Sequence, residues 1–221
     1  MSDGSRLAEQ KIRAPRRRRG AALSVPRILD EAISLIDSKG LEAFSFRILA
    51  GRLGCQAMSL YHYFPSKAHL YEALVDQLIA EAMEYDPSGG WRDRYRSAAG
   101  AYRKMALRHP GMFLYFSGFR LNNHAGLGFL EGILRIFEDA GLEPEDRARH
   151  YRILGHYLVG SCLDQVVKGP SATSPVPFEE ARMAYPSLMA VGPYFAGDRQ
   201  KDVFDAGIDL LIRGIEADLS R

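Results

Sequence analysis

The chain has 221 residues, 47% of them hydrophobic and 25% charged, so it is long enough to bury the core of one large or two small domains. Charges and glycines interrupt every apolar run before it reaches the length of a membrane span, and no apolar segment follows the basic amino terminus. We therefore expect a soluble, cytoplasmic protein. The two cysteines, Cys55 and Cys162, lie far apart in the sequence and are expected to be small apolar core residues rather than a disulfide.

Positive charge is concentrated in the first third of the chain. Residues 1–67 carry twelve Lys and Arg against six Asp and Glu, a formal net charge of +6, whereas the whole chain has +2 and the remainder therefore −4. Such a charge distribution is typical of a protein in which one part binds a polyanion and the other part has a different function.

The amino-terminal segment, residues 1–22, is polar and contains the basic run Arg16–Arg19, which predicts a disordered arm. An arm of this kind can follow nucleic-acid phosphates or enter a minor groove, and it can equally be a solubilising tail. From Ser24 the pattern becomes helical, with Pro26 in the first turn, an apolar stripe from Ile28 to Ile36, and an end at Lys39-Gly40.

Two short helices joined by a glycine follow in residues 44–67. Ser45 is placed to cap the first helix, whose apolar face recurs at helical spacing, and Gly54 is placed to end it. The second helix is expected from Ala57 to Tyr63, with Leu60 facing inward. This outline fits a helix-turn-helix that sets a recognition helix into a DNA major groove, and it also fits an ordinary helical hairpin.

The residues themselves favour the first alternative. The pattern Leu49-Ala50-x-x-Leu53-Gly54, followed by Leu60-Tyr61-x-Tyr63-Phe64-Pro65-Ser66-Lys67, resembles the DNA-binding signature of the TetR family of transcriptional regulators. The resemblance extends from about Ile28 to about Ile79 and includes the preceding helix.

The remaining chain also has helical periodicity, and no segment shows sustained strand alternation. Residues 169–198 hold five of the eleven prolines and are interpreted as a long loop with one short helix at 178–184. The other expected helices are 68–84, 91–108, 127–140, 144–168 and 199–219, with an aromatic stretch at 112–121. The sequence therefore predicts an all-α fold with a domain boundary at residues 86–90.

The resemblance to the TetR family implies the following domain organisation. The chain consists of a basic arm (1–22), a three-helix DNA-binding domain (23–67), a connecting helix (68–85) and a larger helical domain for ligand binding and dimerisation (86–221). The implied function is a ligand-responsive repressor that binds palindromic double-stranded operator DNA as a homodimer and is released by a small-molecule effector.

Carried over by position, the resemblance implies which residues contact DNA. Ala57, Met58 and His62 fall where base edges are commonly met, and Arg47 falls where a guanidinium can reach a guanine or a phosphate. The positions that usually hold the phosphate backbone are Ser59, Tyr61, Tyr63 and Lys67. Gln56 and Cys55 depart from the family, which commonly has Ser or Thr and Val there, and Gln56 could bond an adenine.

For the larger domain, the resemblance implies a dimer formed by the helices near 145–168 and 199–219. Glycines on these helices, Gly155, Gly160, Gly207 and Gly214, would permit close helix approach, although packing within one chain is an alternative. The residues expected to mix an apolar wall with a few polar groups around a ligand are Tyr102, Phe113, Tyr115, Phe116, Phe119, His124, His156 and Gln165.

Two other functions fit the sequence less well. An enzyme would have to use His156, Cys162 and Asp164, but His156 and Cys162 are six apart on a helix and point in different directions. The sequence contains no glycine-rich phosphate loop and no i, i+4 pair of metal ligands, so no cofactor, metal or membrane partner is expected. A protein-interaction module that no longer binds DNA is the second alternative, and the basic amino-terminal part argues against it.

Overall fold

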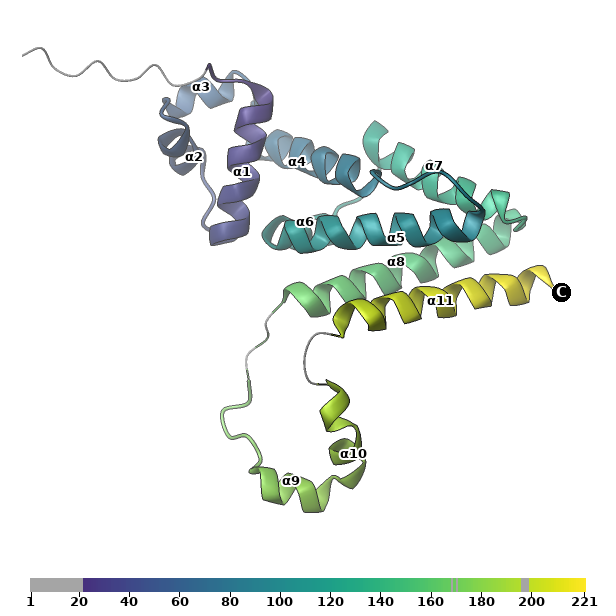
Figure 1. Cartoon of the computed structure of the whole chain (residues 1–221). Coiled ribbons are helices and arrows are strands. Elements are labelled where there is room, and N and C mark those ends of the chain that lie inside the picture. The colour runs from purple at the N-terminus through teal and green to yellow at the C-terminus, as the bar shows by residue number, and fades with distance from the viewer. Residues whose placement is uncertain (1–21, 168, 170, 196–198) are drawn as a thin grey trace, which may run out of the picture.

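The structure is a computed structural model that describes residues 22–167, 169, 171–195 and 199–221; the basic arm predicted at 1–22 lies almost wholly outside them. The described residues fold into eleven helices without a strand, which confirms the all-α prediction (Figure 1). The helices are α1 Val25–Lys39, α2 Phe46–Leu53, α3 Ala57–Tyr61, α4 Lys67–Ala82, α5 Trp91–Arg108, α6 Pro110–Gly118, α7 His124–Asp139, α8 Pro144–Val166, α9 Phe178–Ala184, α10 Pro186–Phe195 and α11 Gln200–Leu219. None of these helices is long and apolar enough to cross a bilayer.

The amino-terminal helices α1, α2 and α3 form one end of the molecule, and α4 leads from them toward the other helices (Figure 1). The apolar stripe of α1 is buried, with Ile28, Leu35 and Ile36 fully inaccessible to solvent. It packs with Leu49 from α2 and Leu60 from α3, which are equally inaccessible. The three short helices thus hold one another together through a shared apolar core.

In the larger part of the molecule, α8 packs against α5 and α7, and α11 packs against both α5 and α8 (Figure 1). Aromatic rings fill this core, for example Tyr95 edge-on to Phe137 with ring centroids 5.7 Å apart. Polar contacts also fix α11: Asp218 lies 2.7 Å from the Arg149 guanidinium and 2.9 Å from Nε2 of His150. Both partners belong to α8, so these contacts join the two helices within one chain.

Several element boundaries differ from the sequence predictions, among them the end of α3, which lies at Tyr61 rather than Tyr63. Helix α6 begins at Pro110 and ends at Gly118, so Phe119 and Leu121 lie in the loop that follows it. Helix α7 begins at His124, three residues before the predicted start, because the Asn123 side chain caps it by accepting a hydrogen bond from Gly126 N at 2.8 Å.

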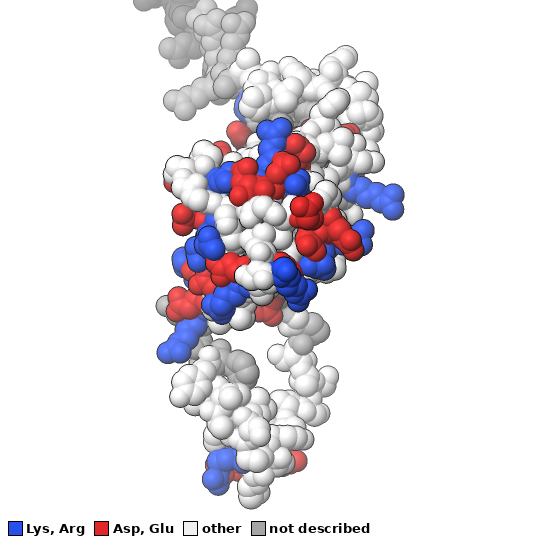
Figure 2. Space-filling model, turned by 90° about the vertical axis from the view of Figure 1, so that its right-hand side faces the viewer, with Lys and Arg blue, Asp and Glu red and all other residues white. Residues whose placement is uncertain are grey.

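The segment predicted as a long loop contains a second helix, α10, besides α9. Pro186 stands at its first position, where the missing N–H costs no hydrogen bond, and the apolar run from Leu188 to Val191 continues it. Helices α9 and α10 contact each other and extend away from the other helices (Figure 1). Figure 2 shows this extension as a largely uncharged surface, below a body whose Lys, Arg, Asp and Glu side chains are interleaved.

A polar cluster connects the amino-terminal helices to the larger part; we call it the interdomain joint and define it as Asp37, Glu81, Arg108, His109 and Gly111. Nδ1 of His109 lies 2.9 Å from Oδ2 of Asp37, and Nε2 lies 3.2 Å from Oε1 of Glu81. Arg108 is 3.5 Å from Glu81. The backbone N–H of Gly111 donates to Oδ1 of Asp37 at 3.0 Å. The start of α6 is therefore bonded to the end of α1 and to α4.

The joint requires a glycine at position 111, which gives a testable prediction. A Cβ there would lie 2.6 Å from the Ile36 carbonyl oxygen and 2.9 Å from Cα of Asp37, both backbone atoms that cannot move aside. We expect Gly111→Ala to lower the free energy of unfolding by about 1–3 kcal/mol. Gly118→Ala, at the other end of α6, meets nothing within 4 Å and is the matched control. Chemical denaturation of both variants measures the difference, and equal stabilities would contradict the prediction.

Candidate functional site

The helix-turn-helix is defined by its capping and its turn. Oγ of Ser45 accepts a hydrogen bond from Ile48 N at 3.2 Å, and this cap fixes the start of α2. Gly54 then adopts the left-handed conformation, with φ 71° and ψ 29°, and Cys55 N bonds back to the Ala50 carbonyl at 3.0 Å. A side chain with a Cβ rarely adopts this conformation, so Gly54 sets the angle between α2 and α3.

Helix α3 has only five residues and depends on its neighbours for its position. Leu60 is fully buried beneath it, and Phe64, just beyond its end, is buried as well. The Tyr61 ring packs edge-on against Phe46 with centroids 4.8 Å apart. These contacts orient the outer face of α3, on which Met58 keeps 66% of its surface exposed.

Two further side chains near α3 are held by backbone carbonyls. Oη of Tyr63 donates to the Leu23 carbonyl at 2.9 Å, and Nζ of Lys67 donates to the Phe44 carbonyl at 2.9 Å. One of the three ammonium hydrogens of Lys67 is used in this way, which leaves the others for a further acceptor. Both groups are therefore oriented before any ligand binds.

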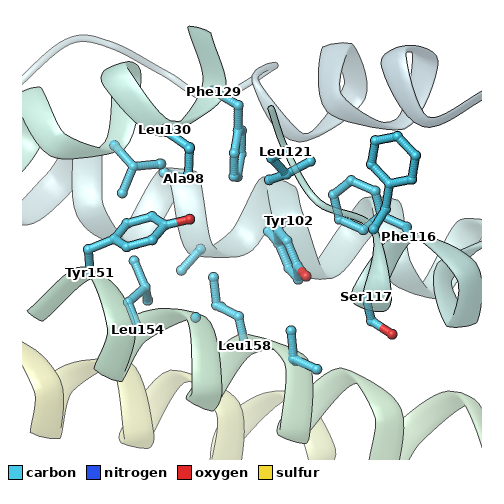
Figure 3. A pocket seen from close by; sticks show the side chains of 15 residues that line it. Ala98, Tyr102, Phe116, Ser117, Leu121, Phe129, Leu130, Tyr151, Leu154 and Leu158 are labelled. Atoms are coloured by element: carbon cyan, nitrogen blue, oxygen red, sulfur yellow. The ribbon is translucent and has the colours of Figure 1, made fainter. Parts of the chain in front are cut away.

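A cavity of about 360 Å³ lies in the larger part of the molecule, between α5, α7, α8 and the end of α6 (Figure 3). Its volume is within the usual range of small-molecule sites. Tyr151 extends into it from α8, and Tyr102 reaches it from α5 (Figure 3). The residues that line it are Ala98, Ala99, Tyr102, Phe116, Ser117, Phe119, Leu121, Phe129, Leu130, Ile133, Tyr151, Leu154, Gly155, Leu158 and Val159.

Two family models match this chain and together cover nearly all of the described helices. The model described as "Tetracyclin repressor-like, C-terminal domain" matches residues 85–219, and the model described as "Bacterial regulatory proteins, tetR family" matches residues 28–74. The chain belongs to the TetR family. This confirms the resemblance found in the sequence between Ile28 and Ile79.

Individual TetR-family proteins match over most of the chain. The class D tetracycline repressor of Escherichia coli is 25% identical over 203 residues, which are 90% of this chain and 92% of that protein. The transcriptional repressor DrrR1 of Streptomyces coeruleorubidus is 26% identical over 158 residues, 70% of this chain but 58% of DrrR1. The crystal structure of a possible TetR-family regulator from Streptomyces coelicolor A3(2) is 27% identical, with a TM-score of 0.71 over 88% of this chain and 99% of that one. These relatives are transcriptional regulators rather than enzymes.

The structure places the residues expected to contact DNA on and around α3 of this TetR-family domain. Arg47 is exposed near the start of α2, Gln56 precedes α3, and Lys67 begins α4. Ala57 and Ser59 are half-buried in α3, whereas the outer positions are exposed. The exposed positions on and after α3 are Met58, Tyr61, His62 and Tyr63.

The residues expected to bind an effector are divided among several places. Tyr102, Phe116 and Phe119 line the cavity, but the other five do not. Phe113 is fully buried in the core, and Tyr115 packs against Tyr71 of α4 with centroids 5.2 Å apart. His124 is exposed at the start of α7. His156 and Gln165 instead line a separate groove between α8 and α11.

Cys162 does not have the environment of a nucleophile. It is fully buried, and burial raises the pKa of its thiol to about 11, so the thiol stays protonated near neutral pH. No hydrogen bond joins it to His156 or Asp164 in the described part of the chain. The three residues considered for catalysis therefore form no catalytic arrangement here.

Sequence reasoning missed two polar groups that bond the larger part of the molecule to α1 and α4. The first is the interdomain joint around His109, and the second is Asn123. Nδ2 of Asn123 donates to Asp76 at 2.9 Å and to Glu72 at 3.3 Å, both on α4. Asn123 follows Leu121, which lines the cavity, by two residues. The sequence around Asn123 could indicate only that it caps the following helix. Its contacts with α4 could not be predicted, because those partners are about fifty positions away in the sequence.

Proposed function

We propose that this TetR-family chain is a ligand-responsive repressor, which binds a palindromic operator as a homodimer and releases it when a small molecule enters the cavity. The observation that carries the proposal is the combination of an exposed surface on α3 with a cavity whose lining residue Leu121 is two residues from Asn123, which is bonded to α4. The basic balance of residues 1–67 supports a polyanionic partner at that end.

In this proposal α3 enters the major groove and α2 crosses the backbone. Arg47 reads a guanine or a phosphate, and Gln56 can pair with an adenine. Met58 offers apolar contact to a thymine methyl. Tyr63 and Lys67, already oriented by the carbonyls of Leu23 and Phe44, bind phosphates and fix the register.

The proposed dimer uses the outer faces of α8 and α11. Exposed residues of α11 recur at helical spacing and are small or apolar: Val203, Ala206, Leu210, Gly214 and Ala217. On α8 the matching exposed positions are Ile153, His156, Gly160 and Asp164. A Cβ at Gly160 or Gly214 would meet nothing within 4 Å in one chain, which leaves room for a second. Gly207 differs, because the Tyr157 ring of the same chain packs on it.

Release follows from linkage between the cavity and α4. Phe119 and Leu121 line the cavity from the loop after α6, and the same loop leads to Asn123, which is bonded to Asp76 on α4. The other end of α6 is bonded to α1 and α4 through the interdomain joint. A ligand that displaces this loop changes the angle of α4, and therefore the spacing of the two recognition helices, which must be roughly 34–36 Å.

The test is fluorescence anisotropy with DNA that flanks the chain's own gene, over a salt series. We expect Arg47→Ala to weaken specific binding by about 1–3 kcal/mol, and Lys67→Ala to weaken binding to all sequences and to reduce the salt slope by about one. Arg135→Ala is the control, because it removes the same charge from the exposed face of α7.

Wild-type protein that prefers this DNA to random DNA, with both substitutions harmful, supports the proposal. Weak binding that is equal for both DNAs and insensitive to either substitution would instead support a protein-interaction module. Such a module would use the helix-turn-helix only as a scaffold.

A further inference from the structure

The walls of the cavity carry no charge. Its lining consists of aliphatic and aromatic side chains together with the hydroxyl groups of Tyr102, Tyr151 and Ser117. Arg103 follows Tyr102 in α5, but its guanidinium donates to Oε1 of Gln165 at 2.6 and 3.1 Å and stacks over Phe204. A carboxylate or ammonium group in the cavity would therefore lose its hydration without gaining a counterion.

Five aromatic residues line the hollow, and they come from each of the segments around it. Tyr102 belongs to α5, Phe116 and Phe119 to α6 and the loop after it, Phe129 to α7, and Tyr151 to α8. Aromatic rings favour stacked or edge-on contacts with other rings. The hollow of about 360 Å³ between these rings has the size and the largely apolar, aromatic lining of small-molecule sites.

Two hydroxyl groups at the cavity lack partners. Ser117 Oγ donates to the Leu114 carbonyl at 3.0 Å, but within the described residues neither Tyr102 nor Tyr151 has a hydrogen bond from its hydroxyl. Tyr102 is only 6% exposed. Burial raises the pKa of both phenols, so they stay protonated near neutral pH and can each donate one hydrogen bond. Neither phenol oxygen is enclosed, since among the described residues the buried side-chain atom without a partner is Nε of Arg94. Both hydroxyls can therefore donate to an acceptor oxygen of a molecule in the cavity.

We infer that the cavity takes an uncharged, aromatic molecule of two or three rings, which carries acceptor oxygens for the hydroxyls of Tyr102 and Tyr151. The inference rests on the proposed function in that this molecule is the effector that releases DNA. The uncharged walls select against ionised compounds, the five rings select flat aromatic ones, and the two phenols orient the bound molecule.

Four probes test this chemistry on the full chain by isothermal titration calorimetry at pH 7.4. Flavone is neutral and carries two acceptor oxygens, whereas 2-phenylnaphthalene has a similar shape without oxygen. Methyl 3-methylflavone-8-carboxylate and its free acid differ in charge at this pH. We expect flavone and the ester to bind, and the acid to bind at least about tenfold more weakly than the ester.

Substitutions at the phenols test the orienting role. Tyr102→Phe and Tyr151→Phe are each expected to weaken flavone binding about three- to tenfold and to leave 2-phenylnaphthalene binding unchanged. Tyr185→Phe is the matched control and should change neither, because it removes the same hydroxyl from an exposed tyrosine that does not line the cavity. The inference is overturned if the acid binds as tightly as the ester, if the phenol substitutions do not distinguish flavone from 2-phenylnaphthalene, or if no probe binds.

The same samples separate this inference from the proposed function. Probe affinities are measured without DNA, operator binding is measured by anisotropy without probe, and release is measured by adding each probe to the operator complex. Probes that bind as expected but fail to release the operator would leave the ligand class in place and refute release by ligand. If the protein binds the operator tightly but its cavity binds the acid better than the ester, only the inference about the ligand class is refuted.

Discussion

Replacement of His109 by Gln is expected to lower the free energy of unfolding by about 3 kcal/mol at pH 6, or roughly 6–12 °C in melting temperature, and by much less at pH 9. His109 lies between carboxylates of α1 and α4, and its side chain is 9% exposed. When protonated, it donates from Nδ1 to Asp37 and from Nε2 to Glu81. Glutamine cannot neutralise these two half-buried carboxylates, and Arg108 reaches only Glu81, at 3.5 Å.

The sign of the pH dependence follows from the folded-state pKa. Burial alone lowers the pKa of His109, but the hydrogen bond to Asp37 and the charges of Glu81 and Asp37 outweigh it and raise the pKa above its ordinary value. The stabilisation is therefore fully present below about pH 6.5, the pKa of an unfolded histidine, and is lost as the pH rises through the folded-state value. The difference between wild type and variant should shrink over this window.

Thermal unfolding of both proteins between pH 5.5 and 9 measures this difference. His124→Gln is the control, because His124 is exposed at the start of α7. If the difference in melting temperature between wild type and variant stays constant across this pH range, or grows as the pH rises, protonated His109 does not stabilise the joint. Because the joint holds α1 and α4 against α6, the same variant should also release operator DNA at a lower effector concentration.

The helix-turn-helix was predictable because its determinants are local. Ser45 caps a residue three positions away, Gly54 ends the helix in which it lies, and Leu60 is inward by helical periodicity. The family signature also lies in this segment, so the sequence predicted both the two helices and the exposed side of the second. The second helix ended two residues earlier than expected, at Tyr61.

The interdomain joint and the cavity were not predictable in the same way. His109 meets partners 72 and 28 positions away, and in the sequence it is only the residue that follows the helix predicted at 91–108. The aromatic stretch after it was recognised, but its periodicity does not reveal that Phe116 faces the cavity while Phe113 is enclosed by the core. That distinction depends on how α6 packs against α5 and α8, which is a tertiary property.

Leu210→Arg is expected to convert the proposed dimer into monomers and to reduce operator affinity at least about a hundredfold. Leu210 lies at the middle of the exposed stripe of α11 and keeps 61% of its surface exposed in one chain. An arginine there would place an unpaired charge in the apolar contact face of each subunit. A monomer binds each half-site separately. It therefore loses the increase in affinity that comes from linking two binding contacts, which is typically about 10²–10⁴-fold.

Light scattering coupled to size-exclusion chromatography gives the mass of each variant, and anisotropy gives its operator affinity. Leu127→Arg is the matched control, because Leu127 is an exposed leucine on α7, away from the α8 and α11 faces. A Leu210→Arg protein that keeps the dimer mass would show that these helices do not form the interface. A monomeric variant with undiminished operator affinity would show instead that DNA binding does not depend on the dimer. The two measurements therefore test the assembly and its role in recognition separately.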